Sequence, residues 1–393
     1  MNLLPAVRGP EVARVAQQLA GGGGIVTVAA DTAEEAVAVR KLAVAQLDDS
    51  WAMAAVDITR CVSTRDLAVQ LARAVCSMVI SDATALDLPD EQLTVDQRAE
   101  LVRLANTAGA RLLRGARGDV GEHDDVRDHQ ELIGDALDTI TRRAASNGRT
   151  LLALDGADEL LELPRKSRAR FTGAADLLWL IRGRVQHAVV TPTIVFAGGP
   201  ATTDLVSDRA GGMFGWGTEV TVERAPAQIL HTAVMAQLET QRPVGTAAFR
   251  DEVARAVIDR AERSLPTIER LLPVLPRDRG GSASAAVLRA WTTLLEMNAD
   301  VLRQAARALS ALDRLALAVA RAIAERRPPY TIAEAPHGSE VAKALASLRI
   351  AGFATSPQKG DWRLTDPLFA AWLRGRASRG RAAVEVQDLR RIG

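Results

Sequence analysis

The sequence predicts an α/β protein in which a parallel five-stranded sheet is followed by an all-helical region and a small unit of helices with a hairpin. Short apolar runs alternate with segments of helical periodicity as far as residue 224, which is typical of a parallel sheet covered by helices. From 225 to about 308 the chain reads as helix throughout. Between 309 and 376 helices precede a hairpin, and residues 377–393 form a basic tail.

Five apolar runs in the first 224 residues have the length of strands. The runs at 25–28, 151–154 and 194–197 are continuously apolar, as strands buried on both faces of a sheet are. The predicted strands are Ile25–Val28, Ala52–Ile58, Thr150–Leu154, Thr193–Ala197 and Glu219–Val222.

Helices are expected before and between these strands. Thr32, followed three residues later by Glu35, is a capping-box signature that predicts a helix start directly after the first strand. A helical insertion is expected at about 81–130, with a polar loop at 117–128. The other predicted helices cover about 10–19, 64–80, 94–114, a long segment ending near 146, and 172–187.

The C-terminal part divides into two predicted domains. Residues 225–308 are expected to form a helical lid domain with an internal loop at 280–282. In residues 309–376, helices at 310–326 and 338–350 are followed by strands at 353–355 and 362–364, and a last helix begins at Pro367. Helices followed by a two-stranded wing are typical of a winged helix-turn-helix domain.

The composition is that of an ordinary globular protein, with 48% apolar and 25% charged residues and a net charge of +1. This balance implies no partner attracted by overall charge. The two cysteines, Cys61 and Cys76, do not suggest a disulfide framework. No apolar stretch approaches the ~20 residues of a membrane span, and the first residues do not resemble a signal peptide. We therefore expect a cytoplasmic protein without a membrane partner.

The most informative segment is Leu151–Leu160, LLALDGADEL, in which an apolar strand runs into Asp155 and is followed by Asp158 and Glu159. Carboxylates at this place hold Mg²⁺ beside phosphates in P-loop nucleotide sites. The other half of such a site is a Gly-x-x-x-x-Gly-Lys-Ser/Thr loop. It is absent, because none of the four lysines, Lys41, Lys166, Lys343 and Lys359, follows a glycine. Asp155 as a turn cap, and Asp158 and Glu159 as solvated acids, remain the alternative.

The turn after the first strand also disfavours phosphate. The glycines Gly21–Gly24 precede the strand, whereas a P-loop follows it. A helix start normally attracts anions, but Asp31, Glu34 and Glu35 place negative charge there. We therefore expect no cofactor; ATP with Mg²⁺ is the alternative.

The order of parts resembles the prokaryotic P-loop ATPases of the AAA+ and STAND groups that carry a C-terminal winged helix. Arg8–Glu11 resembles their Arg-x-x-Glu segment, and Leu151–Leu160 resembles a NACHT-type Walker B motif. Ile194–Pro200 resembles their sensor strand, and Trp362–Leu373 the end of their winged helix. The resemblance implies that the strands at 25–28, 151–154 and 194–197 are neighbours in the centre of the sheet.

The chain departs from this pattern in three places. The Walker A motif is missing, and Gly198 or Gly199 stands at the sensor position. If the AAA+ pattern applies, Gly156 stands where a catalytic Glu would be, whereas the NACHT pattern tolerates glycine there. We therefore predict a degenerate site without catalytic residues. Asp155, Asp158 and Glu159 would contact a cofactor only if a nucleotide binds. No metal site is predicted, because His123, Asp124, Asp125 and His129 lie in an irregular loop.

DNA contact by the predicted winged helix is a further possibility. The candidate residues lie on its second helix, on its wing and at the start of the tail, where Glu340 and Asp361 weaken the basic character. They are Lys343, Arg349, Lys359, Arg363, Arg374 and Arg376.

These observations favour a regulatory or scaffold protein on a non-catalytic NTPase fold, acting through contacts with a protein partner or with itself. A weakly active AAA+/STAND ATPase switch and a DNA-binding regulator are the alternatives.

Overall fold

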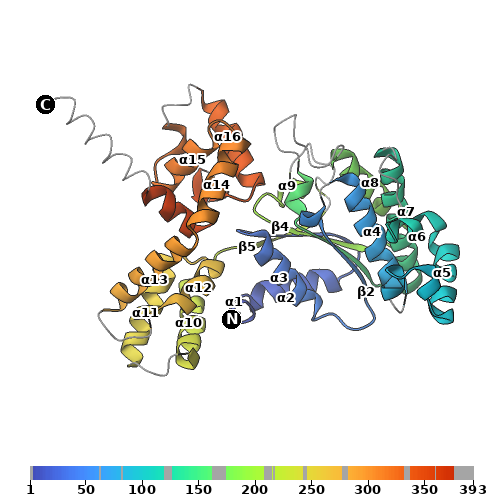
Figure 1. Cartoon of the computed structure of the whole chain (residues 1–393), viewed down its shortest axis with the longest axis horizontal. Helices are drawn as coiled ribbons and strands as arrows, with labels where there is room; N and C mark the ends of the chain where they lie inside the picture. Colours follow the sequence, from blue (N-terminus) through green and yellow to red (C-terminus); the bar gives the residue numbers. More distant parts are fainter. Residues whose placement is uncertain are drawn as a thin grey trace. The chain divides into compact units, whose positions relative to one another are not determined.

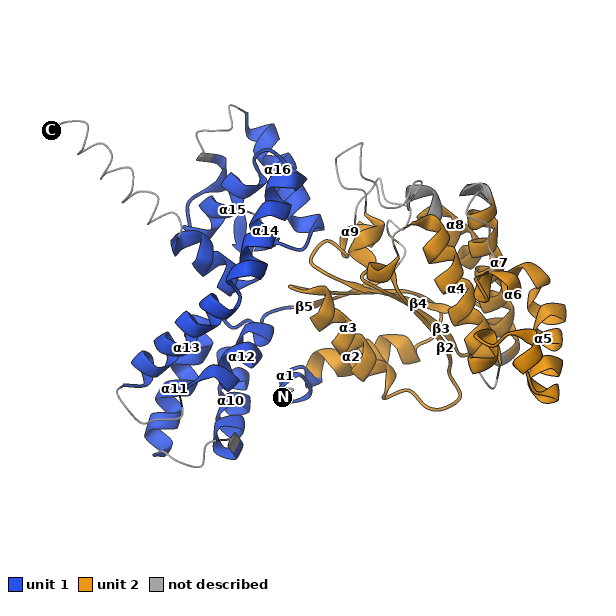
Figure 2. Ribbon diagram, in the orientation of Figure 1, with its two compact units in different colours: residues 1–9, 223–393 blue, residues 10–222 orange. Residues whose placement is uncertain are grey.

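The computed structural model describes residues 3–61, 63–80, 83–118, 126–161, 174–207, 215, 217–241, 246–276, 282–331, 337–358 and 360–375. Its contacts divide the chain into two compact units. One contains residues 10–222, and the other combines residues 1–9 with 223–393 (Figure 2).

The unit of residues 10–222 is built on a parallel five-stranded sheet with the order β2-β3-β4-β1-β5. The strands are β1 (Gly24–Ala30), β2 (Ala52–Asp57), β3 (Thr150–Asp155), β4 (Thr193–Gly198) and β5 (Thr218–Val222). The predicted parallel sheet is confirmed, and so is the expectation that the strands at 25–28, 151–154 and 194–197 lie side by side in its centre.

Burial follows the position of each strand in the sheet. All six residues of β3 and all six of β4 are buried, whereas the edge strand β5 alternates between exposed and buried residues. Continuous apolar runs therefore mark the central strands, which are covered on both faces.

Helices cover both faces of this sheet (Figure 1). On one face of the sheet, strand residues that include Ala54, Leu152, Leu154 and Phe196 belong to an apolar cluster. The α-helices that contribute to this cluster are α4 (Thr64–Val79), α5 (Val95–Ala108), α6 (Ala110–Ala116), α7 (Val126–Asn147), α8 (Ala174–Gln186) and α9 (Asp204–Ser207). Helices α2 (Gly9–Ala20) and α3 (Ala33–Val44) lie on the opposite side, where α3 packs on β1 and β4.

The predicted helix at 94–114 is two helices. Gly109 has φ +105°, a backbone conformation in which an α-helix cannot continue, and it separates α5 from α6. Most of the polar segment 117–128 lies outside the described residues.

The second unit is mainly helical. It contains α1 (Leu4–Val7), α10 (Ala227–Gln241), α11 (Ala247–Arg260), α12 (Leu265–Leu271), α13 (Ala283–Met297), α14 (Ala299–Leu312), α15 (Ala316–Ala324) and α16 (Gly338–Ile350). The helix expected at 310–326 does not exist as one piece, because α14 runs to Leu312 and α15 starts at Ala316. Asp313 causes the break: its backbone is extended and its carboxylate accepts the N–H of Leu315 at 2.9 Å.

After α16, β6 (Ala354–Gln358) and β7 (Asp361–Leu364) form an antiparallel pair in which Ala354 faces Leu364. Residues 367–375 are helical, and Phe369 stacks on Trp372 with ring centroids 6.0 Å apart. The order of helices and hairpin is the expected one, and the winged-helix interpretation remains a prediction. Among the described residues, no helix is both long and apolar enough to cross a membrane.

Candidate functional site

Asp155, the last residue of β3, is paired with an arginine from its own chain. Arg40 of α3 donates from Nε to Oδ1 at 3.1 Å and from Nη2 to Oδ2 at 2.5 Å. Arg40 is 5% exposed and Asp155 7%. Burial raises the pKa of Asp155, while the charge and hydrogen bonds of Arg40 oppose that rise. Both carboxylate oxygens, which would face Mg²⁺ in a P-loop nucleotide site, therefore face a guanidinium.

Arg40 reaches this carboxylate because it lies on the buried face of α3. Ala36, Val39, Arg40 and Ala43 are all buried, and their spacing places them on one side of the helix. Arg40 was not among the residues predicted from the sequence. A charged residue inside an otherwise apolar helical stripe is the signal that could have identified it, because a buried charge requires a partner.

The connection from β1 to α3 is too short to form a phosphate cradle. Only Asp31 and Thr32 separate the strand from the helix, whereas the Gly-x-x-x-x-Gly-Lys-Ser/Thr motif spans about eight residues. The predicted cap at Thr32 is present, with its hydroxyl accepting the N–H of Glu35 at 3.3 Å. Glu34 and Glu35 lie in the first turn of the helix. The described turn is therefore short and acidic, and the Thr32 hydroxyl already occupies the N–H of Glu35.

The carboxylate of Asp158 connects the turn after β3 to the end of β4 by hydrogen bonds. Its Oδ1 accepts the N–H of Gly199 at 2.6 Å and the hydroxyl of Thr202 at 2.8 Å. A Cβ added at Gly198 would lie 1.9 Å from that oxygen. Burial raises the pKa of Asp158. The glycines at the sensor position therefore make room for Asp158, which links the turn after β3 to the end of β4.

Gly156 cannot be replaced by a catalytic glutamate without rearrangement. Its φ is +74°, and a Cβ would lie 2.3 Å from the Cγ2 atom of Thr59. Glu159 belongs to the 3₁₀ turn Ala157–Leu160 and is half-buried. The structure thus gathers Asp155, Asp158 and Glu159 around one turn, with Asp155 and Asp158 already bonded to their own chain.

The DNA-binding candidates within the described residues lie on two features of the C-terminal unit. Lys343 is exposed and Arg349 half-buried on α16. Arg363 of β7 and Arg374 of the last helix instead line a different feature, a cavity beside the hairpin. Lys359 and Arg376 lie outside the described residues.

The described residues contain no group of three or more His, Cys, Asp or Glu side chains placed to hold a metal ion. His129 is buried on α7. His123, Asp124 and Asp125 lie outside the part of the chain that the structure describes.

Comparison with protein-family models and with curated protein sequences gives no match. Solved structures do resemble the chain. The Walker-type ATPase PABY2304 of Pyrococcus abyssi aligns with a TM-score of 0.59 at 11% identity, over 93% of this chain and 95% of that one. The ORC2 protein of Aeropyrum pernix, in ADPNP and ADP complexes, aligns with a TM-score of 0.50 at 14% identity, over 93% and 92%. At such low identities, structural similarity shows the fold alone. The chain has the fold of the AAA+ P-loop ATPases.

Proposed function

We propose that this chain is a non-catalytic NTPase-fold protein that acts as a regulator or scaffold through protein–protein contacts. The observation that carries the proposal is the buried, two-bond pair between Arg40 and Asp155. It places a permanent positive group against the carboxylate that the family uses for its metal ion.

The pair weakens nucleotide binding by an amount that can be bounded. Binding Mg²⁺ to Asp155 would leave Arg40 buried without its carboxylate, and breaking a buried ion pair costs about 3–5 kcal/mol. Micromolar binding corresponds to about 8 kcal/mol and millimolar binding to about 4 kcal/mol. An otherwise micromolar site would thus keep about 3–5 kcal/mol of binding free energy, a dissociation constant of about 0.2–5 mM, before the missing phosphate loop is considered.

Two further features support the loss of hydrolysis. Gly156 leaves no space for a side chain that could activate water, since a Cβ would approach Thr59 at 2.3 Å. Asp158, the next acid along the chain, accepts two hydrogen bonds from the end of β4. A carboxylate held in this way supports the geometry of the sheet.

Calorimetric titration with ATP and MgCl₂ tests the proposal. We expect the protein to give no binding heat in the micromolar range, and we expect Asp155→Ala to give the same result. Micromolar binding that disappears in Asp155→Ala would support the weakly active ATPase switch instead. Lys41→Ala, which alters the exposed residue next to Arg40, is the matched control.

DNA binding is the second candidate function, and the helix–helix–hairpin order after α14 favours it. A DNA-binding protein should lose affinity steeply as salt rises, because phosphate contacts release counterions. Retention of duplex DNA that falls with salt, and that weakens in Lys343→Ala, would favour this function over the scaffold.

A further inference from the structure

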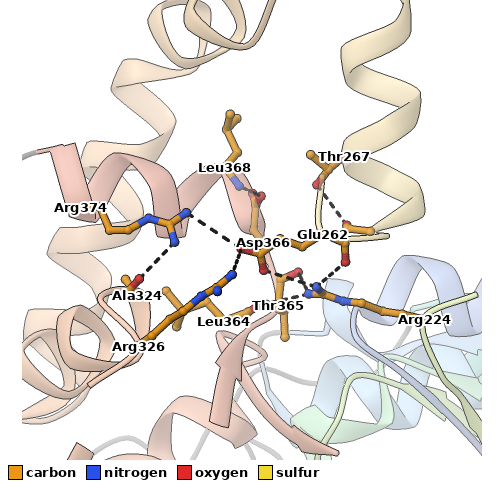
Figure 3. Close-up of polar contacts among 11 residues, drawn as sticks. Arg224, Glu262, Thr267, Ala324, Arg326, Leu364, Thr365, Asp366, Leu368 and Arg374 are labelled. Carbon is orange, nitrogen blue, oxygen red and sulfur yellow. Dashed lines mark hydrogen bonds and ion pairs between the residues drawn. The ribbon is translucent and has the colours of Figure 1, made fainter. Parts of the chain in front are cut away.

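A buried arginine organises the junction between the α11–α12 turn and the end of the hairpin (Figure 3). The Arg224 side chain is 6% exposed. It donates to the carbonyl oxygen of Glu262 at 2.7 Å and to those of Leu364 and Thr365 at 3.2 and 3.3 Å. Its Nη1 also lies 3.6 Å from Glu262 Oε2. Arg224 therefore fixes both the backbone and the carboxylate of Glu262.

Two further arginines face the other oxygen of the same carboxylate (Figure 3). Arg326 Nη2 lies 3.9 Å from Glu262 Oε1, and Arg374 Nη2 lies 4.0 Å from it. Both distances exceed those of a charge-assisted hydrogen bond. The Arg326 side chain is 82% exposed and that of Arg374 39%. Three guanidinium groups thus surround one carboxylate, which leaves positive charge directed outward.

These residues line a cavity of about 560 Å³ beside β7 and the end of α15. The charged residues of its lining are Arg326, Arg327, Arg363, Arg374, Glu262 and Asp361. Arg327 is also paired with Glu325, at 2.7 Å. The aromatic residues Tyr330 and Trp362 also line the cavity. The cavity therefore combines a net positive charge with an apolar surface.

The backbone at Arg326 gives an independent reason to assign this cavity a role. Arg326 has φ +56°, and the N–H of Arg327 bonds the carbonyl oxygen of Ala322 at 2.8 Å. This is the left-handed helix ending at which glycine is normally found. Glu262, at φ +48°, also adopts the left-handed region. Side chains retained at strained positions commonly belong to functional sites.

We propose that this cavity binds a phosphate monoester that carries an aromatic or similarly flat group. A phosphate monoester bears a charge of about −1.5 to −2 at neutral pH, which suits the three guanidinium groups around the single carboxylate of Glu262. Guanidinium groups bind phosphate oxygens through paired hydrogen bonds. Arg326 and Arg374 are the phosphate contacts, and Tyr330 and Trp362 accommodate the attached group.

Phenyl phosphate and inorganic phosphate are the probes for a calorimetric titration of the full chain at constant ionic strength. Saturable binding of both, with phenyl phosphate tighter, is the expected result. Inorganic phosphate as the equal or better ligand would overturn the aromatic part of the proposal, and the absence of saturable binding of either would overturn all of it.

The variant Arg326→Gly separates binding from folding. Glycine relieves the left-handed strain, so we expect an unchanged or higher Tm together with a loss of phosphate affinity of about fivefold or more. Arg303→Ala, an exposed arginine on α14, should bind as the unaltered protein does. Unchanged affinity in Arg326→Gly would refute the site. Because Asp155 lies in the other unit, Asp155→Ala leaves this test unaffected, and the two proposals can fail separately.

Discussion

Removing the arginine of the buried pair is the most informative perturbation of the 10–222 unit. In Arg40→Met the side chain keeps a similar length but Asp155 loses both of its hydrogen-bond donors. Because Arg40 and Asp155 are only 5% and 7% exposed, water cannot readily replace the guanidinium. Loss of one partner of a buried pair should cost about 3–5 kcal/mol.

Amide hydrogen exchange of β3 and β4 measures this loss in the unit that contains the pair. The protection free energy of these amides should fall by about 3–5 kcal/mol in Arg40→Met. In the control Lys41→Ala, a surface change, it should stay within about 0.5 kcal/mol.

The double variant Arg40→Met with Asp155→Leu gives a second, sharper expectation. Replacing both partners by apolar residues removes the unpaired charge, so the protection of β3 should recover to within about 1 kcal/mol of the unaltered protein. A loss below about 1 kcal/mol in Arg40→Met, or a double variant no better than the single one, would refute the reasoning.

Three other substitutions test the surroundings of the site and the C-terminal helix. Burial raises the folded-state pKa of Asp158, so its ionisation costs stability as pH rises above about 4. In thermal melts, the Tm of Asp158→Asn should therefore rise relative to that of the unaltered protein between about pH 4 and 7. A Tm difference that does not change with pH would contradict this. Gly156→Ala, at φ +74° and facing Thr59, should cost about 2–4 kcal/mol in denaturant unfolding, and a loss near zero would show that the turn relaxes. Trp372→Ala removes a half-buried ring stacked on Phe369, so we expect a loss of about 2 kcal/mol, below that of a fully buried ring, and an unchanged Tm would identify a surface residue.

The sheet could be predicted from the sequence because burial on both faces requires continuous apolar runs, as at Leu151–Leu154. The order of neighbouring strands did not follow from periodicity. It was predicted from the resemblance to P-loop ATPases. Helix ends were less accessible. The break at Gly109 depends on one backbone angle, and the break at Asp313 depends on one side-chain hydrogen bond. The apolar periodicity of the sequence continues across both positions and does not reveal either break.

The chemistry of the site was predicted only in part. Asp155 and Asp158 could be identified because an acid after a buried strand is a strong local pattern. Their partners could not, since Arg40 and Gly199 are distant in sequence and meet them only through the strand order. The glycines at 198 and 199 indicated a lost sensor residue in the sequence. In the structure they make room for the carboxylate of Asp158.

A crystal structure grown with millimolar ATP and MgCl₂ would show whether Arg40 occupies the place of the nucleotide-bound metal. We expect no nucleotide at the turn between β1 and α3, with both oxygens of Asp155 still bonded to Arg40. A nucleotide at that turn, with Mg²⁺ on Asp155 and Arg40 displaced, would contradict it.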